Sequence, residues 1–349
     1  MRNRAITIFL LALFYICSFQ VYASTSIENY LKENFESGTI LVIKGNKTIF
    51  NKAYGFADVN KRVLNTINTQ FPIASLSKIF TSVAILKLAE NNVLNINDKL
   101  DKALPTYKAK WSKDVSLHHL LTHTSGVPNY IETEEFKKLY KSPQSTQTVI
   151  NIGKDLPLRF IPGSKYEYSG FGFNLLGAVI EHASNIKYED YLANNFFIPL
   201  KMSRTFIPRN KLVSSLYTKN KILAKGYLKD KNNLIETKGL NLSLAFGEAG
   251  IISTTHDLYK WQKGLFKGKL LSENYLNLML TNHSQNHGYG IFISTKLSNE
   301  KVYYHQGRIN GFSTIMAYEP KRDIHIIILS NIMETKVYEI TRKLFEMIN

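Results

Sequence analysis

The residues best placed to do chemistry are Ser75 and Lys78, three positions apart at the start of a long apolar segment. Pro72 favours an extended or turn conformation before them, and the apolar residues from Ile79 to Leu88 recur at helical spacing. We therefore expect Ser75 to open a helix, with Lys78 one turn further along the same face. A serine hydroxyl needs a base to take its proton, and a desolvated lysine can act as one. A helix N-terminus also points N–H groups at an anion bonded to that serine.

The Ser-x-x-Lys spacing alone is a weak signal, because it occurs at Ser75/Lys78, Ser184/Lys187 and Ser298/Lys301. Only the first pair combines a turn or strand before it with a long amphipathic helix behind it. The structural alternative for that pair is an N-cap serine followed by an exposed lysine.

The first 23 residues have the features of a secretory signal peptide. Arg2 and Arg4 precede an apolar run that is short for a transmembrane span, and Ala23 ends a suitable cleavage site. The alternative is an uncleaved membrane anchor. We expect an exported protein, periplasmic or extracellular after cleavage near Ala23. Cleavage would remove Cys17, the only cysteine, and with it any disulfide, cysteine nucleophile or cysteine metal ligand.

The composition is that of a globular protein with a strong positive charge. The chain has 349 residues, of which 44% are hydrophobic and 20% charged, and its net charge is +17. Its lysines are scattered rather than gathered in a basic stripe with aromatic residues, so we expect no nucleic acid as a partner. An anionic cell-envelope surface is a partner that this charge would suit, although a lysine-rich composition explains it equally well.

Hydrophobic periodicity places β runs at both ends of the chain and helices between them. Helices are predicted over 26–35, 117–123, 171–183, 257–265 and 335–347, and strands over 39–43, 48–56, 289–293, 302–305, 312–318 and 324–329. The segment Lys211–Leu240 gives no clear assignment. The predicted fold is therefore α/β (α+β), with an antiparallel sheet built from both chain ends, flanked by helices, and a mostly helical insert.

Three histidines lie close together in the predicted helix at 117–123. His119 and His123 have the i, i+4 spacing of metal ligands. No glutamate follows the first histidine as a metalloprotease motif requires, and His118 and His119 point to different faces. A structural role near the helix end is favoured, with Thr122 and its polar neighbours as hydrogen-bond partners. We expect no metal and no cofactor.

Two further segments contain groups that could serve a serine nucleophile. Tyr168 precedes a helix, and a tyrosine beside a lysine can accept or pass a proton, although packing is the commoner role. His305 follows a β run, and Gly307 could let a ligand lie against the strand edge. No Gly-x-Ser-x-Gly elbow, P-loop or Gly-x-Gly-x-x-Gly pattern is present.

In this order along the chain, five segments resemble the serine β-lactamase and penicillin-binding protein superfamily. The likeness is nearest to its class C β-lactamase, DD-peptidase and esterase branch and covers nearly the whole mature chain. The segments are Ser75–Lys78, His118–Pro128, Tyr168–Gly170, Gly247–Leu258 and His305–Gly307. The fold of that superfamily also has sheet strands from both chain ends and a helical insert.

The resemblance implies a role for each matching residue. Ser75 would attack a carbonyl, Lys78 would help to activate it, and Tyr168 would serve as general base and then protonate the leaving group. The backbone N–H groups of Ser75 and Arg308 would form the oxyanion hole. His305 would hold a substrate carboxylate or take part in the proton network of the tyrosine.

One matched position departs from the pattern. Gly170 stands where the superfamily usually has an asparagine that contacts the lysine and the substrate amide. The lack of this asparagine side chain argues against efficient β-lactam or peptide cleavage more than against acyl transfer in general.

We therefore expect a signal peptide (1–23) and one hydrolase domain (24–349), with a sheet subdomain at about 24–75 and 285–349 and a helical insert at about 90–245. The expected function is that of a secreted serine hydrolase that forms an acyl-enzyme with a cell-wall D-amino-acid peptide, a β-lactam or an ester. The alternatives are a non-catalytic penicillin- or peptidoglycan-binding or sensor protein on the same fold, and a purely electrostatic wall-binding protein.

Overall fold

The computed structural model describes residues 25–140, 142–208, 222–231, 233–237 and 241–348. The predicted signal peptide lies outside the described residues, as does much of the segment that the sequence left unassigned. None of the helices in the described ranges is long and apolar enough to cross a membrane.

The central element is an antiparallel sheet with strands from both ends of the chain, as predicted. Its order is β2-β1-β12-β11-β10-β9. The bounds are β1 (Gly38–Lys44), β2 (Lys47–Tyr54), β9 (Phe292–Ser294), β10 (Val302–Ile309), β11 (Phe312–Glu319) and β12 (Ile324–Ser330). Strands β1 and β12 pair in the middle of the sheet, with Ile40 opposite Ile328. The N-terminal hairpin therefore joins the C-terminal strands directly.

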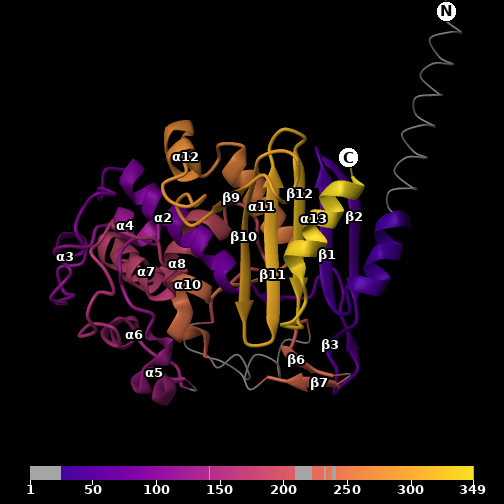
Figure 1. Ribbon diagram of the computed structural model, residues 1–349, viewed down its shortest axis with the longest axis horizontal. Coiled ribbons are helices and arrows are strands. Elements are labelled where there is room, and N and C mark those ends of the chain that lie inside the picture. The colour runs from indigo at the N-terminus through magenta and orange to yellow at the C-terminus, as the bar shows by residue number, and fades with distance from the viewer. Residues whose placement is uncertain (1–24, 141, 209–221, 232, 238–240, 349) are drawn as a thin grey trace, which may run out of the picture.

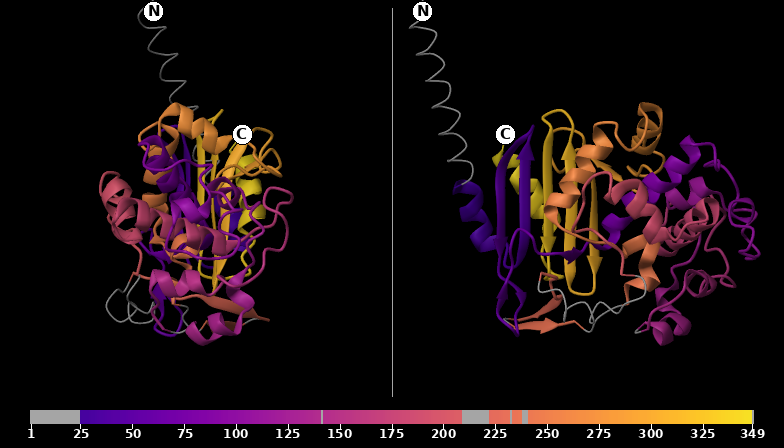
Figure 2. Two further views of the ribbon diagram at one scale, coloured as in Figure 1. Left: turned by 90° about the vertical axis from the view of Figure 1, so that its left-hand side faces the viewer. Right: turned by 180° about the vertical axis from the view of Figure 1, so that it is seen from behind.

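Helices cover both faces of this sheet (Figures 1 and 2). Helix α13 (Val337–Met347) and the helix at residues 25–34 pack on one face, and α11 (Thr255–Phe266) packs on the other. Because side chains alternate along a strand, Ile326 and Ile328 of β12 face α13. Ile327 and Leu329 face the opposite core. A strand buried on both faces explains the unbroken apolar run in β12.

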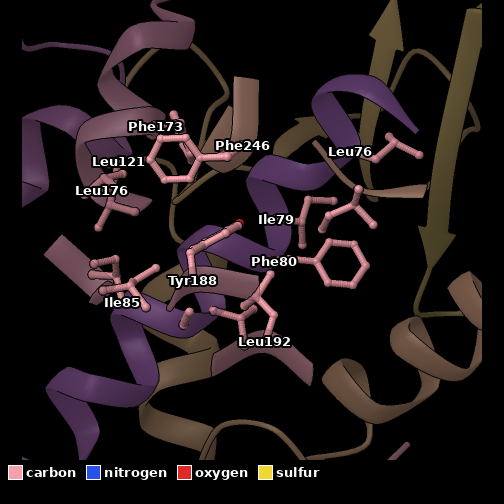
Figure 3. Close-up of a cluster of buried hydrophobic side chains, with 14 of the residues drawn as sticks. Leu76, Ile79, Phe80, Ile85, Leu121, Phe173, Leu176, Tyr188, Leu192 and Phe246 are labelled. Carbon is pink, nitrogen blue, oxygen red and sulfur yellow. The ribbon is translucent and has the colours of Figure 1, made fainter. Parts of the chain in front are cut away.

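The helical part lies beside the sheet (Figure 1), and its buried side chains pack around α2 (Figure 3). Its Phe80 stacks on Trp261 with ring centroids 3.8 Å apart, and Phe173 and Leu176 of α7 belong to the same core. The helices of this part are α2 (Ser77–Glu90), α3 (Leu100–Ala103), α4 (Leu117–Leu121), α5 (Glu134–Leu139), α6 (Thr146–Asn151), α7 (Gly170–Ser184), α8 (Tyr188–Leu192), α10 (Phe246–Ala249) and α12 (Glu273–Leu280). Buried on nearly every side, α2 provides a rigid base for the residues at its N-terminus.

Three short strand pairs complete the described structure: β3 (Phe56–Asp58) with β4 (Val63–Leu64), β5 (Phe71–Pro72) with β8 (Ile252–Ser253), and β6 (Tyr227–Asp230) with β7 (Asn233–Glu236). The last pair lies in the segment that the sequence left unassigned.

Five sequence predictions need correction. The helix predicted over 117–123 ends at Leu121, and His123 beyond it has a φ of 57°, so His119 and His123 do not share a helix face. The strand predicted over 48–56 is interrupted at Gly55, which has a φ of 63° and separates β2 from β3.

The other three corrections concern the site and the far end of the sheet. Ser75 does not open the α-helix but lies in a 3-10 turn, η1 (Ala74–Leu76), and α2 begins at Ser77. The strand predicted over 302–305 continues to Ile309, so Gly307 lies within β10 rather than after it. Residues 289–291 are not in a strand, and β9 begins at Phe292. Gly290 there has a positive φ of 66°, a backbone conformation outside the extended region that strands need.

Candidate active site

Ser75 lies in a turn that is fixed by neighbours on both sides. The Ile73 N–H donates to the Ile251 carbonyl at 2.9 Å, and the Thr314 hydroxyl donates to the Ile73 carbonyl at 2.9 Å. Ala74 has a φ of 51°, in the left-handed region that costs a non-glycine residue about 1 kcal/mol. This fixed turn leaves Ser75 partly exposed between buried residues. The hydroxyl is therefore held in place and yet accessible to a ligand.

Lys78 is the second residue of α2, is fully buried and points back at Ser75. Its Nζ donates to Ser75 Oγ at 3.1 Å and to the backbone carbonyl of Glu248 at 3.0 Å. The carboxylate of Glu248 forms an ion pair with it, with Oε2 3.6 Å from Nζ. A buried cation needs such partners, because removing an ion from water costs several kcal/mol of folding free energy. The predicted serine–lysine pair is thus in contact.

Tyr168 lies over Lys78 at the start of α7. The Lys78 Nζ is 5.1 Å from the centroid of its ring, and the residue is 39% exposed. His123 stacks on the same ring, with centroids 4.2 Å apart. Ser, Lys and Tyr, separated in the sequence, therefore converge on one site.

His123 fixes the segment that carries Tyr168. Its carbonyl accepts from the Glu167 N–H at 2.9 Å, and its Nδ1 accepts from the Ser169 N–H at 3.1 Å. Burial, together with the charges of His287 and Lys78, holds the pKa of His123 well below its usual range, so that the ring is a neutral acceptor. The sequence prediction gave this histidine a structural role but named the wrong partners.

His305 faces the site from β10 and is also buried and neutral. Its Nδ1 donates to the Gln306 carbonyl at 2.7 Å, and its ring centroid is 6.4 Å from that of Tyr168. Burial above all, and then the charges of Lys78 and His287, keep the pKa of His305 well below its ordinary value. A neutral imidazole can take part in a proton network but offers no positive charge to a carboxylate.

Gly307 is the point where β10 meets the turn of Ser75. A Cβ at this position would fall 2.8 Å from the Ile73 carbonyl oxygen and 2.8 Å from the Ala74 Cβ. Only glycine allows this approach without a shift of the backbone. Gly307 thus allows the turn of Ser75 to lie against the strand edge.

The Arg308 side chain points away from the site. Its guanidinium donates to the Met333 carbonyl at 3.0 Å, on the face of the sheet that α13 covers. There it lines a groove of about 420 Å³ together with Gln306 and Lys336. Ser75 is not among the lining residues of this groove, although Gly307 is. Any contribution of Arg308 to the site would come from its backbone.

Gly170 opens α7 directly beneath the carboxylate of Glu248. A Cβ on Gly170 would lie 1.6 Å from Glu248 Oε2. The superfamily usually has an asparagine side chain at position 170. In this protein a carboxylate from α10 occupies that space instead. Sequence reasoning identified Gly170 and placed Glu248 in a matching segment, but gave no sign that the two residues meet, because they are 78 positions apart.

The two other histidines of the 117–123 segment have separate partners. His118 Nδ1 is 2.9 Å from the Tyr289 hydroxyl, and His119 Nδ1 accepts from the Ser116 N–H as part of the N-terminal cap of α4. Within the described ranges, no three or more histidine, cysteine, aspartate or glutamate side chains are grouped to hold a metal ion.

A serine hydroxyl in contact with a buried lysine, a tyrosine above both and a strand edge beside them define the serine β-lactamase and transpeptidase type of site. A sequence model of the beta-lactamase family matches residues 24–346, and the chain belongs to this family.

The relatives agree with this membership. Protein flp of Staphylococcus aureus (strain MRSA252) is 30% identical over 326 residues, which cover 90% of this chain and 63% of that protein. The chain thus spans less than two thirds of its relative's length. The crystal structure of a penicillin-binding protein from Bacillus halodurans superposes with a TM-score of 0.79 at 25% identity and covers 93% of this chain and 99% of that one. The D-amino acid amidase of Ochrobactrum anthropi SV3 shares the fold, with a TM-score of 0.81 at 19% identity over 95% and 99% of the two chains.

Proposed function

We propose that the protein is a serine hydrolase that cleaves a carboxylic amide or ester through an acyl-enzyme on Ser75. The observation that carries the proposal is the contact of 3.1 Å between Lys78 Nζ and Ser75 Oγ in a turn that remains partly exposed. A buried lysine that donates to a serine oxygen is costly to maintain, and such groups concentrate at functional sites.

In the proposed reaction, Ser75 Oγ bonds to the substrate carbonyl carbon. Because Lys78 donates to Oγ, the serine's own proton is free to pass to Tyr168. Tyr168 relays the proton: its oxygen takes the proton from the serine while its own hydroxyl proton passes to the leaving amine or alcohol, and the bond between that group and the acyl carbon breaks. Water next attacks the acyl carbon, its proton passes to Ser75 Oγ by the same route, and the acid is released. The N–H groups of Ser75 and Arg308 are proposed to stabilise the oxyanion.

The substrate is proposed at the level of a class. A cell-wall D-amino-acid peptide, a β-lactam and an ester all offer an acyl carbon, and the relative from Bacillus halodurans is named as a penicillin-binding protein. Because His305 is neutral, the structure gives less support to the expectation that this side chain holds a substrate carboxylate. We also propose export, with cleavage near Ala23, to the periplasm or the cell exterior. The net charge is +17 for the whole chain, and the part that remains after Arg2 and Arg4 are removed would suit an anionic envelope surface.

A non-catalytic binding or sensor protein is the second candidate. It is favoured by Gly170, which removes a hydrogen-bonding side chain from the site. Such a protein would bind a penicillin or a wall peptide without turning it over.

The test is the intact mass of the protein after mixing with a fluorophosphonate and, separately, with a penicillin, with Ser75→Ala as the control. We expect a fluorophosphonate adduct that Ser75→Ala lacks. A lasting penicillin adduct would indicate a penicillin-binding peptidase, and penicillin turnover would indicate a β-lactamase. Fluorophosphonate labelling without penicillin reaction would favour an esterase. No adduct with either reagent would reject the catalytic proposal.

A further inference from the structure

The carboxylate of Glu248 occupies the space that a side chain at position 170 would fill. A Cβ on Gly170 would lie 1.6 Å from Oε2, far inside any real contact distance. Gly170 is the first residue of α7 and Glu248 belongs to α10, and these two helices pack together. The carboxylate can therefore adopt this position only because residue 170 is a glycine.

This carboxylate is held by donors on two sides. Oε1 lies 2.7 Å from the Tyr130 hydroxyl, which shares its one proton between Oε1 and the Leu244 carbonyl at 2.6 Å, and 3.5 Å from Asn174 Nδ2. Burial first, and the Glu248 charge second, raise the pKa of Tyr130 far above its usual range, so that Tyr130 remains a donor. Oε2 faces Lys78 Nζ at 3.6 Å with its side chain only 14% exposed. The carboxylate is thus fixed at the ion-pair distance from the lysine that contacts Ser75.

We propose that Glu248 positions Lys78 against Ser75 and makes the site select substrates that lack a carboxylate beside the scissile bond. This role rests on the proposed function, because it concerns the same serine. Glu248 holds Nζ through both its backbone carbonyl and its carboxylate, which restricts the lysine to the geometry that reaches Oγ. Because both side chains of this pair are largely buried, their attraction is screened less than it would be at the surface.

The selectivity follows from the charges at the site. Lys78 is offset by the Glu248 carboxylate, His305 is neutral, and the Arg308 guanidinium is turned to the far face of the sheet. None of these three residues offers an unpaired positive charge to an anionic substrate. Glu248 adds a negative charge that repels one. A neutral ester or amide needs no positive charge to bind and is not repelled by the Glu248 carboxylate.

The positioning role is tested by the rate at which fluorophosphonate labels Ser75. Glu248→Gln and Glu248→Ala should each slow labelling about tenfold, the usual effect of losing one charged contact. Gly170→Ala should also slow labelling about tenfold while leaving the fold intact. Its Cβ would displace the flexible end of the Glu248 side chain from Lys78. The double variant Gly170→Ala/Glu248→Ala should be no slower than either single variant, because both changes break one contact. Glu134→Gln, an exposed carboxylate in α5, is the matched control.

The selectivity is tested with methyl 3-acetoxybenzoate and 3-acetoxybenzoate, two acetate esters that differ only in a leaving-group carboxylate. The wild type should prefer the neutral ester by about tenfold in kcat/KM, the size expected of one charge contact. Glu248→Gln should narrow that ratio, whereas a purely structural role would lower both rates and leave the ratio unchanged.

The failure of this proposal can be told from the failure of the proposed function. Wild-type labelling at Ser75 that Glu248→Ala and Glu248→Gln leave unchanged would overturn the role of Glu248 alone. Additive losses in the double variant, or a preference for the anionic ester in the wild type, would also overturn it. No labelling of the wild type would overturn both proposals. Melting temperatures of all variants within a few degrees of wild type would show that the measured rates come from folded protein.

Discussion

At the scale of single residues, the orientation of Tyr168 depends on His123. The histidine ring stacks on the tyrosine, and its carbonyl and Nδ1 accept the N–H groups on either side of that residue, Glu167 and Ser169. A general base must be held within hydrogen-bond reach of the proton it takes, and loss of that restraint lowers the rate without touching the substrate.

We predict that His123→Asn slows fluorophosphonate labelling of Ser75 by about tenfold, since the ring beneath Tyr168 is lost. Asparagine suits the test because position 123 has a φ of 57°, which asparagine tolerates better than most residues do. The measurement is the labelling rate, followed by intact mass. His182→Asn, at an exposed position of α7, should label like the wild type. An unchanged rate in His123→Asn would show that Tyr168 does not depend on this support.

At the scale of elements, the site depends on the close approach of β10 to the 3-10 turn of Ser75. We predict that Gly307→Ala destabilises the protein by about 1–3 kcal/mol, the usual cost of overpacking, and slows labelling of Ser75. The added Cβ would lie 2.8 Å from the Ile73 carbonyl oxygen, and a backbone atom cannot move aside as a side chain can. Strand and turn must therefore separate.

The comparison is with Gln306→Ala on the same strand, whose exposed side chain faces the other side of the sheet. Urea unfolding and labelling rates are measured for both variants. If Gly307→Ala and Gln306→Ala have the same unfolding free energy and the same labelling rate, the strand edge and the turn of Ser75 are not coupled.

The sequence predicted these elements well where local patterns determine them. The antiparallel sheet from both chain ends and α7 follow from periodicity, and the contact of Ser75 with Lys78 follows from their spacing. The position of Glu248 could not be predicted, because only the packing of α10 on α7 brings it to Gly170. The 3-10 turn at Ser75 depends on hydrogen bonds from Thr314 and to Ile251, which are equally remote in the sequence.

At the scale of the whole molecule, the site lies where the sheet meets the helical part. Folding buries several neutral histidines around it. His123, His287 and His305 have exposed fractions of 1%, 0% and 1%. Burial is the largest cause that lowers the pKa of each, and it brings the pKa of His287 to about 3. In the unfolded chain these side chains would titrate near 6.5.

We predict that the protein loses stability as the pH falls below about 6.5. Between that value and the lowered pKa of about 3 for His287, the unfolded chain binds a proton that the folded chain does not. The stabilisation is therefore complete above pH 6.5 and declines toward pH 3. One such histidine contributes a slope of at most about 1.4 kcal/mol per pH unit, so that about 2 kcal/mol per histidine is lost between pH 7 and pH 5.

The check is the free energy of unfolding in urea at pH 7 and at pH 5, for the wild type, His287→Phe and His182→Phe. Phenylalanine cannot bind a proton and suits the aromatic surroundings of His287, whose ring lies 4.5 Å from Phe292 and 4.9 Å from His123. His287→Phe should lose about 2 kcal/mol less than the wild type between the two pH values. The exposed His182→Phe should lose as much as the wild type does. If His287→Phe is as sensitive to acid as the wild type, His287 is not a source of the pH dependence, and the burial of the other histidines or of other groups must account for it.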